Sequence, residues 1–138
     1  MIGDHLLDTS ALWFLFRDAR AMEAWHEHIA SGAFGICEAT RAEFLFSAMS
    51  AAHRDELAED LDRMCRTVPV PKHAWRWVET AQHRLTQRGQ HRSAGVIDLL
   101  VCATAVHHDR TVLHLDNDFR SVASVMTELR ERDVRPMA

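Results

Sequence analysis

Residues 5–10 of the chain, HLLDTS, place two leucines directly before an aspartate and two hydroxyl residues. The apolar pair predicts a buried β-strand that ends at Asp8. A second segment repeats this pattern, because TVLHL at 111–115 is followed by Asp116 and Asp118. In an open parallel α/β sheet, ligands bind outside the carboxyl ends of the strands. The two segments therefore predict that acidic side chains from separate strands meet at one edge of a sheet.

The rest of the chain alternates short apolar runs with longer segments of helical periodicity. Strands are expected at 5–8, 34–37, 67–70 and 111–115, with a short terminal strand near Val134. Helices are expected at 18–32, 40–50, 53–66, 71–89, 94–107 and 119–132. This alternation implies parallel pairing, with helices on both faces of the sheet. We therefore predict a single α/β domain over residues 1–138, a three-layer α/β/α sandwich whose mainly parallel sheet has four to five strands.

The composition is typical of a soluble globular domain, with 47% apolar and 26% charged residues in a chain of 138. The apolar run at 12–16 is too short to span a bilayer. Asp4 and Asp8 lie where a signal peptide would carry positive charge. The three cysteines and ten histidines show no zinc-ligand spacing, and the cysteines are expected to be reduced core residues. We expect a cytoplasmic protein with no membrane segment.

Asp98 is the strongest single candidate for a functional acid. Ten of the thirteen residues at 94–106 are apolar, and Asp98 is the only charged residue among them. An isolated buried carboxylate costs several kcal/mol or stays protonated, and no basic residue lies one helical turn away. A divalent cation would compensate this charge. Alternatively, Asp98 caps a helix that begins near Leu99.

Glu43 lies near the start of the helix after the second strand, at the same edge of the sheet as Asp8. The sequence from Thr40 to Glu43 also matches a capping box, in which the glutamate reaches back to a backbone N–H. Both interpretations remain open. Thr9 and Ser10 follow Asp8 directly and are candidates to orient substrate or water by hydroxyl donation, or else to cap the following helix.

If these acids converge, the chemistry of the site follows from their charge. Clustered carboxylates repel one another and hold protons at neutral pH unless a cation neutralises them. Oxygen ligands suit Mg²⁺ or Mn²⁺, which keep several waters and take phosphate oxygens into their shell. Such ions activate water and stabilise an in-line displacement at phosphorus. The expected reaction is phosphodiester hydrolysis.

A basic stripe is formed by Arg84, Arg88 and Arg92, which follow one another at four-residue steps. The stripe is either a solvated helix face or a contact for a nucleic-acid backbone. The net charge of −4 is unlike that of a protein that coats nucleic acid, but a few arginines can still steer such a substrate to a site. A dense aromatic cluster is expected to pack in the core or to form a groove for a partner: Trp13, Phe14 and Phe16.

Taken together, these motifs resemble those of the PIN-domain nucleases, and within them the VapC toxins. The segment around Asp8 resembles their opening strand, and RAEFL at 41–45 is similar to their second acidic position. The segment around Asp98 resembles their third motif, and 111–119 resembles the last motif of the VapC branch. The four motifs occur in the usual order and spacing and cover nearly the whole chain.

This resemblance implies a PIN-like fold and an Mg²⁺-dependent endoribonuclease, with Mn²⁺ as an alternative ion, acting on structured RNA such as tRNA or rRNA. It assigns catalysis to Asp8, Glu43, Asp98 and Asp116, and metal ligation to Asp8 and Asp98 together with Asp116 or Asp118. The close pair of acids at 116 and 118 departs from the family pattern, and we expect Asp116 to be the fourth acid. The resemblance also implies a homodimer and a VapB-like antitoxin that inserts into the site.

Two other functions are compatible with the sequence. The first is a catalytically inert PIN-like module that binds RNA or a protein, although such a module has no reason to keep costly clustered acids. The second is a metal-dependent nuclease for flapped DNA. The short chain, with no arch or duplex-binding segment, argues against this DNA nuclease.

Overall fold

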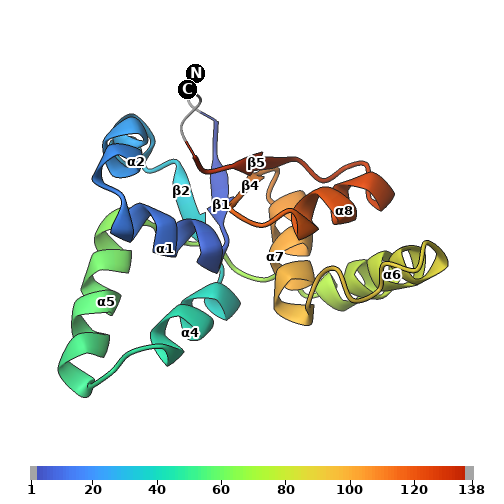
Figure 1. Cartoon of the computed structure of the whole chain (residues 1–138), viewed down its shortest axis with the longest axis horizontal. Coiled ribbons are helices and arrows are strands. Elements are labelled where there is room, and N and C mark those ends of the chain that lie inside the picture. The colour runs from blue at the N-terminus through green and yellow to red at the C-terminus, as the bar shows by residue number, and fades with distance from the viewer. Residues whose placement is uncertain (1–2, 136–138) are drawn as a thin grey trace.

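The expected alternation of strands and helices forms a sheet of five parallel strands in a computed structural model, which describes residues 3–135 (Figure 1). The strands are β1 (His5–Leu7), β2 (Phe34–Ile36), β3 (Arg66–Thr67), β4 (Thr111–His114) and β5 (Glu131–Asp133). Their order across the sheet is β3-β2-β1-β4-β5, and each neighbouring pair is parallel. The predicted α/β fold class is confirmed.

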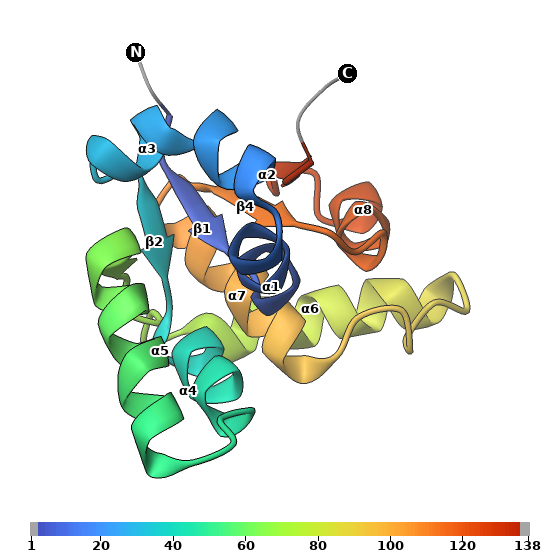
Figure 2. The same cartoon turned by 60° about the vertical axis from the view of Figure 1, so that its left-hand side comes forward.

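Helices cover both faces of this sheet (Figures 1 and 2). They are α1 (Thr9–Arg17), α2 (Ala19–Ala24), α3 (His26–Ala30), α4 (Glu38–Phe46), α5 (Ala51–Met64), α6 (Ala74–Gln87), α7 (Val96–His107) and α8 (Asp118–Val125). Figure 1 shows α1, α2, α4 and α5 on one side of the sheet and α6, α7 and α8 on the other.

The alternation of side chains along the strands divides the core into two clusters. In β1, Leu6 packs with the cluster of α6, α7 and α8, whereas Leu7 packs with that of α1, α2, α4 and α5. In β4, Val112 and Leu113 divide in the same way. These four side chains have no exposed surface, as expected for parallel strands buried on both faces.

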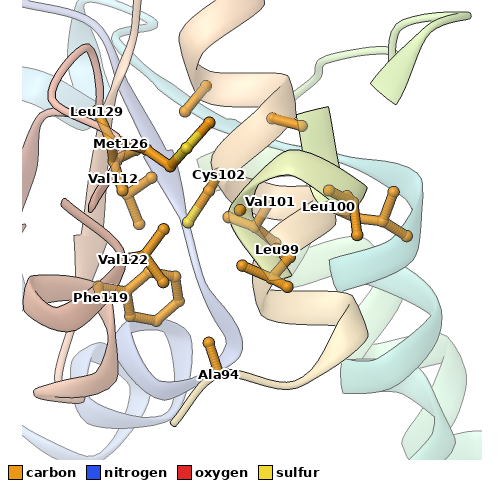
Figure 3. Packing of buried hydrophobic residues seen from close by; sticks show 14 of the residues in the cluster. Ala94, Leu99, Leu100, Val101, Cys102, Val112, Phe119, Val122, Met126 and Leu129 are labelled. Carbon is orange, nitrogen blue, oxygen red and sulfur yellow. The ribbon is translucent and has the colours of Figure 1, made fainter. Parts of the chain in front are cut away.

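Helix α7 is the apolar centre of one of these clusters. Figure 3 shows Cys102 directed toward Val112, Val122 and Phe119, while Leu100 lies on the other side of the helix. Residues 99–105 of α7 are all buried, so its apolar sequence reflects burial on most faces. The first turn of α7, with Asp98, is held in place by this packing.

The predicted helix at 18–32 is two short helices instead. Asp18 caps α2 as expected, accepting hydrogen bonds from the backbone N–H groups of Arg20 and Ala21 at 3.0 and 3.1 Å. The helix is interrupted at Trp25, whose indole N–H donates to the carbonyl of Val134 at 2.8 Å. Residues 18–30 follow one helical periodicity, so the sequence predicts a continuous helix. The break depends on the bond to Val134, which is distant in the sequence and leaves no mark on that periodicity.

The predicted helix at 119–132 is also wrong in its second half. Helix α8 ends at Val125, and residues 131–133 form β5, so the terminal strand precedes Val134 rather than containing it. The strand has the sequence Glu-Arg-Asp and none of its residues is buried. Charged residues are common on edge strands because they discourage pairing with another chain. Such a strand has no apolar alternation by which the sequence could reveal it.

The remaining boundaries differ by a few residues. Helix α6 begins three residues after Pro71, α4 spans Glu38–Phe46 rather than 40–50, and β3 is limited to two residues. The aromatic cluster on α1 is half-buried and packs against the core, with the rings of Trp13 and Phe16 centred 4.4 and 5.5 Å from that of Phe44. Of the helices in the described part of the chain, none has the length and apolarity that crossing a membrane requires.

An aromatic cluster with a buried histidine closes the amino-terminal edge of the sheet. The ring of His5 makes edge contacts with Trp25 and His28, with centroids 5.4 and 5.3 Å away. Burial, assisted by the nearby charges of His28 and Arg132, lowers the pKa of His5 to about 4, although a bond from its ring to the carbonyl of Gly3 opposes the shift. The neutral form of His5 is therefore the one that the fold accepts.

We predict that the wild-type protein loses about 2 kcal/mol of unfolding free energy through His5 as the pH falls from 6.5 to 4. In this range the unfolded state takes up a proton that the folded state excludes. His5→Phe keeps the aromatic packing and should remove this loss, whereas His26→Phe, which replaces an exposed histidine, should not. Urea unfolding at several pH values measures the effect, and parallel pH profiles for wild type and His5→Phe would contradict it.

Candidate active site

The strand order places two acids at the point where the direction of the chain across the sheet reverses. From β1 the chain proceeds outward to β2 and β3, then crosses back to β4 on the other side of β1. Asp8 follows β1 and Asp116 follows β4 closely, so both lie at the carboxyl edge. Crevices at such a switch point are the usual ligand sites of open α/β sheets. The strand order therefore explains why Asp8 and Asp116 lie at the same edge of the sheet.

Asp8 is buried, with 4% of its surface exposed, and is the N-cap of α1. Its Oδ2 accepts hydrogen bonds from the backbone N–H and the hydroxyl of Ser10, at 3.1 and 2.6 Å. Burial raises the pKa of Asp8, the bonds from Ser10 and the backbone of Thr9 oppose the shift, and the charge of Glu43 adds to it. The interpretation of Thr9 or Ser10 as the helix cap is therefore wrong, because Asp8 has this role.

Glu43 is held by the other hydroxyl of the first motif. The Oγ1 of Thr9 donates to Oε1 of Glu43 at 2.5 Å, which links α1 to α4. The capping-box interpretation is wrong, because α4 begins at Glu38 and Thr40 lies buried inside the helix, near the sulfur of Cys37. Glu43 is exposed, so it is the outermost of the four acids.

Asp98 is the third residue of α7, so it does not precede the helix as a cap at Leu99 would require. Its Oδ2 accepts a bond from the backbone N–H of Gly95 at 3.2 Å, an interaction that closes the first turn. Asp98 is half-buried rather than buried.

The surroundings of Asp98 disfavour its charged form. Burial is the largest cause that raises its pKa, followed by the charges of Asp8, Asp116 and Glu43, and together they bring it to about 6 despite the bond from Gly95. The four predicted acids therefore act on one another through space.

Of the two acids after β4, Asp116 is the one whose charge reaches Asp98. Its Oδ1 accepts a bond from the backbone N–H of Asp118 at 2.9 Å, at the start of α8. Burial and the neighbouring Asp116 raise the pKa of Asp118. Asp116 is therefore the better placed of the two to act together with Asp98, and its role as the fourth acid stays a prediction.

The four acids do not form a ready-made metal cage. Within residues 3–135, no three histidine, cysteine, aspartate or glutamate side chains are close enough together to hold one ion. Each of the four carboxylates is instead oriented by a protein donor through one oxygen. A carboxylate has lone pairs beyond those that one such bond uses. The arrangement offers oriented oxygen ligands rather than a complete coordination shell.

Ser10 also connects the two strands that carry the acids. The backbone N–H of Leu115 donates to Oγ of Ser10 at 2.9 Å, and this hydroxyl donates in turn to Asp8. Sequence reasoning placed Ser10 against the substrate and missed this bridge. It also missed His114, which bonds to the backbone of Asp116. The only signal in the sequence was a polar residue inside an apolar strand.

The basic stripe is divided between two roles. Arg84 donates to the carbonyl of Val125 at 3.0 Å, and Arg88 donates to the hydroxyl of Ser124 at 3.1 Å, so both contact the end of α8. Arg92 lies exposed in the loop between α6 and α7. None of the three bonds to an acid of the site in the part of the chain that the structure describes. Their contact with substrate stays a prediction.

Comparison with known proteins places this site in a family context. A family model for the PIN domain matches residues 5–125. Ribonuclease VapC6 of Mycobacterium tuberculosis is 40% identical over 105 residues, which cover 76% of this chain and 83% of that protein. Ribonuclease VapC2 of the same species is 37% identical over 129 residues, which cover 92% of this chain and 90% of that protein.

Solved structures show the same architecture. A chain of DNA-bound VapBC from Salmonella typhimurium superposes with a TM-score of 0.78 at 14% identity, covering 97% of this chain and 100% of that one. A chain of VapBC2 from Rickettsia felis, bound to a promoter DNA fragment, has a TM-score of 0.77 at 14% identity, covering 94% and 97%. At this identity the likeness shows the fold alone.

We predict that Asp98→Asn stabilises the protein in EDTA by about 1–2 kcal/mol at pH 8, a range that allows for solvent screening of a half-buried group. The folded protein raises the pKa of Asp98 to about 6. As the pH rises from 4 to 6, the unfolded state releases this proton while the folded state keeps it, so wild type loses stability over this range. The asparagine can still accept the bond from Gly95, so the difference should vanish below pH 4.

The matched control for this prediction is Asp55→Asn, which changes an exposed acid of α5 and should have little effect at either pH. Urea unfolding of the three proteins is the measurement. Equal stability of wild type and Asp98→Asn at pH 8 would show that the acids do not destabilise the folded state.

Proposed function

The chain belongs to the PIN-domain family, and from this premise we propose that it is an endoribonuclease, the toxin of a VapBC-type toxin–antitoxin pair. The observation that carries the proposal is the set of acids at the carboxyl edge, where the charges of three of them raise the pKa of the fourth, Asp98. A fold that only binds a partner gains nothing from this repulsion. Relatives of 40% and 37% identity are named ribonucleases, which supports the same activity.

We further propose that the site takes Mg²⁺, or Mn²⁺ in its place. The donor set fits, since it consists of carboxylate oxygens whose repulsion a cation would relieve. Mg²⁺ is usually held by one or two carboxylates and keeps waters and substrate phosphates in its shell. A site without three converging side chains is compatible with that mode of binding. Asp8 and Asp98 would hold the ion directly, and Asp116 would bind it through one of the waters that Mg²⁺ keeps.

When bound, the ion would supply charge neutralisation, polarisation of the scissile phosphate and a more acidic water. The residues of the chain supply orientation. Ser10 fixes the carboxylate of Asp8, and Thr9 fixes that of Glu43, by donating their hydroxyl hydrogens. With acids already oriented, less freedom is lost when the substrate binds, which is how positioning lowers a barrier.

The substrate in this proposal is structured RNA, such as tRNA or rRNA. The net charge of −4 and the acidic edge repel an RNA backbone, so binding requires local positive charge. The exposed arginines of α6 and the following loop are suited to this role, because guanidinium groups bind phosphate in a bidentate manner.

The proposal includes a VapB-like antitoxin and a homodimer in the cytoplasm. The two solved structures reported above are of VapBC complexes, and the relatives named above are VapC proteins. Large apolar side chains on the surface of the chain are available for such contacts. They are Phe46, Met49, Trp75 and Val96, with exposed fractions of 91, 89, 58 and 48%.

We predict that purified protein cleaves RNA in Mg²⁺, and that Asp8→Asn lowers kcat by roughly a hundredfold or more, as removal of a charged group aimed at the reacting centre does. The asparagine can still accept the bonds from Ser10, so the fold should be kept. Cleavage of labelled total RNA is followed on gels, with EDTA and Asp55→Asn as controls.

Other outcomes of this experiment point to the alternatives. RNA binding that is unchanged in EDTA, with no cleavage in Mg²⁺ by folded protein, would support an inert binding module. Cleavage of flapped DNA in preference to RNA would support a DNA nuclease. RNA cleavage at the wild-type rate by Asp8→Asn would remove the acidic edge from the mechanism.

We also predict that Arg88→Gln combined with Arg92→Gln raises KM for RNA and flattens the dependence of KM on salt, while kcat changes by less than about twofold. Contacts to phosphate act on substrate binding and release counterions. Arg63→Gln on α5 is the matched control, because Arg63 pairs with Glu59 and Asp60 of its own helix. An unchanged salt dependence in the double variant would make the stripe a solvated helix face.

A further inference from the structure

His114 joins the turn that carries Asp116 to the neighbouring strand. It is the last residue of β4 and has 1% of its surface exposed. Its Nδ1 accepts a hydrogen bond from the backbone N–H of Asp116 at 3.1 Å. Its Nε2 lies 2.8 Å from Oε1 of Glu131 on β5. The imidazole therefore has one partner on the acidic turn and another on the edge strand.

These two bonds assign the position of the ring hydrogen. Nδ1 accepts a bond, so it carries no hydrogen, and Nε2 faces a carboxylate oxygen, so it carries the hydrogen and donates. Glu131 thus selects the tautomer in which Nδ1 is free to accept. The other tautomer would direct a ring hydrogen at the amide hydrogen of Asp116. Partners of this kind fix the tautomer and orientation of histidines at functional sites.

Packing prevents the ring from leaving this position. The ring of Phe119, in the first turn of α8, is stacked on that of His114, with centroids 4.9 Å apart and planes inclined by 25°. Phe119 has no exposed surface. On the outer side, Nε of Arg120 lies 4.0 Å from the same oxygen of Glu131, on a side chain that is largely exposed.

Three backbone N–H groups of the acidic turn each donate to a different side chain. That of Leu115 donates to Ser10, that of Asp116 to His114, and that of Asp118 to the carboxylate of Asp116. The first bond ties the turn to the start of α1, and the second ties it, through His114 and Glu131, to β5. Rotation of the peptide before Asp116 would break the bond to His114.

We propose that His114 is a positioning residue for Asp116 and that Glu131 fixes its tautomer. The inference rests on the proposed function, because it gives the Glu131–His114–Asp116 connection a purpose in RNA cleavage. The position of the Asp116 turn can also be tested without RNA. The bond to Asp116 needs an acceptor at the position of Nδ1, and any side chain that keeps this acceptor should keep the geometry of the turn.

Two substitutions of His114 separate its two bonds. Asparagine places its carbonyl oxygen near the position of Nδ1, whereas glutamine places its amide near the position of Nε2. In metal-free protein, His114→Gln should speed hydrogen exchange of the Asp116 amide by about tenfold or more, because its acceptor is lost. Nitrogen NMR of wild type should show the hydrogen of the His114 ring on Nε2.

The same variants should differ in metal affinity and turnover. We expect His114→Gln to weaken Mn²⁺ binding about tenfold, a typical loss for a residue that orients a ligand, and to lower kcat with little change in KM. His114→Asn should restore most of the amide protection and of the Mn²⁺ affinity. Unchanged amide exchange and Mn²⁺ affinity in His114→Gln would overturn the proposal.

A second pair of variants tests the same claim at Glu131, so that the result does not depend on replacing the buried His114. Glu131→Leu deprives Nε2 of its acceptor and should release the ring, giving faster Asp116 amide exchange and a mixture of tautomers. Glu131→Gln offers a carbonyl oxygen and should keep the wild-type tautomer. Arg120→Gln, on an exposed side chain, is the matched control. The wild-type tautomer and exchange rate in Glu131→Leu would overturn the role of Glu131.

Failure of this inference can be distinguished from failure of the proposed function by Asp116→Asn. If His114→Gln cleaves RNA like wild type while Asp116→Asn does not, the positioning role is overturned and the ribonuclease stands. If neither substitution affects RNA cleavage, Asp116 has no part in the reaction and the positioning role is overturned with it. Parallel losses in both variants, with the Asp116 amide unprotected in His114→Gln, support the proposal.

Discussion

Repulsion between four carboxylates at the carboxyl edge of β1 and β4 is the constraint around which this structure is built. The chain offers these acids no basic partner among the ion pairs of residues 3–135. Burial first, and then the charges of Asp8, Asp116 and Glu43, raise the pKa of Asp98 to about 6. Neutral donors hold each acid instead: two hydroxyls and several backbone N–H groups. Such donors orient a carboxylate without cancelling its charge, which leaves the charge available to a cation.

The two halves of the core support this edge from opposite faces. One half anchors α7, whose buried residues from Leu99 onward fix the first turn and with it Asp98. The other anchors α1 and α4, which bring the first motif and Glu43 together. Ser10 and His114 then couple the two strands between these halves to one another and to β5. The folded state stores electrostatic strain at the site, and the apolar core offsets it, as is usual for functional sites.

Much of the fold and of the acid set could be predicted from the sequence, because both depend on local patterns. Buried strands that end in aspartate, and an apolar helix with one charge, are visible without coordinates. The edge strand β5 could not be predicted, since its three residues are charged and its partner β4 lies 17 residues or more away along the chain. The break at Trp25 and the bridge from Ser10 depend on long-range bonds to Val134 and Leu115. The capping interpretations of Thr40 and Asp98 failed because each helix begins two residues before the residue in question.

Calorimetric titration of the metal-free protein with Mn²⁺, in buffers of different ionisation enthalpy, tests the central claim most directly. If the acids form one cation site, Mn²⁺ binds to a single saturable class of sites and releases a fraction of a proton at pH 6. The release should fade at pH 8, where Asp98 is already ionised. Absence of saturable binding, or binding at pH 6 with no release of protons, would contradict the account.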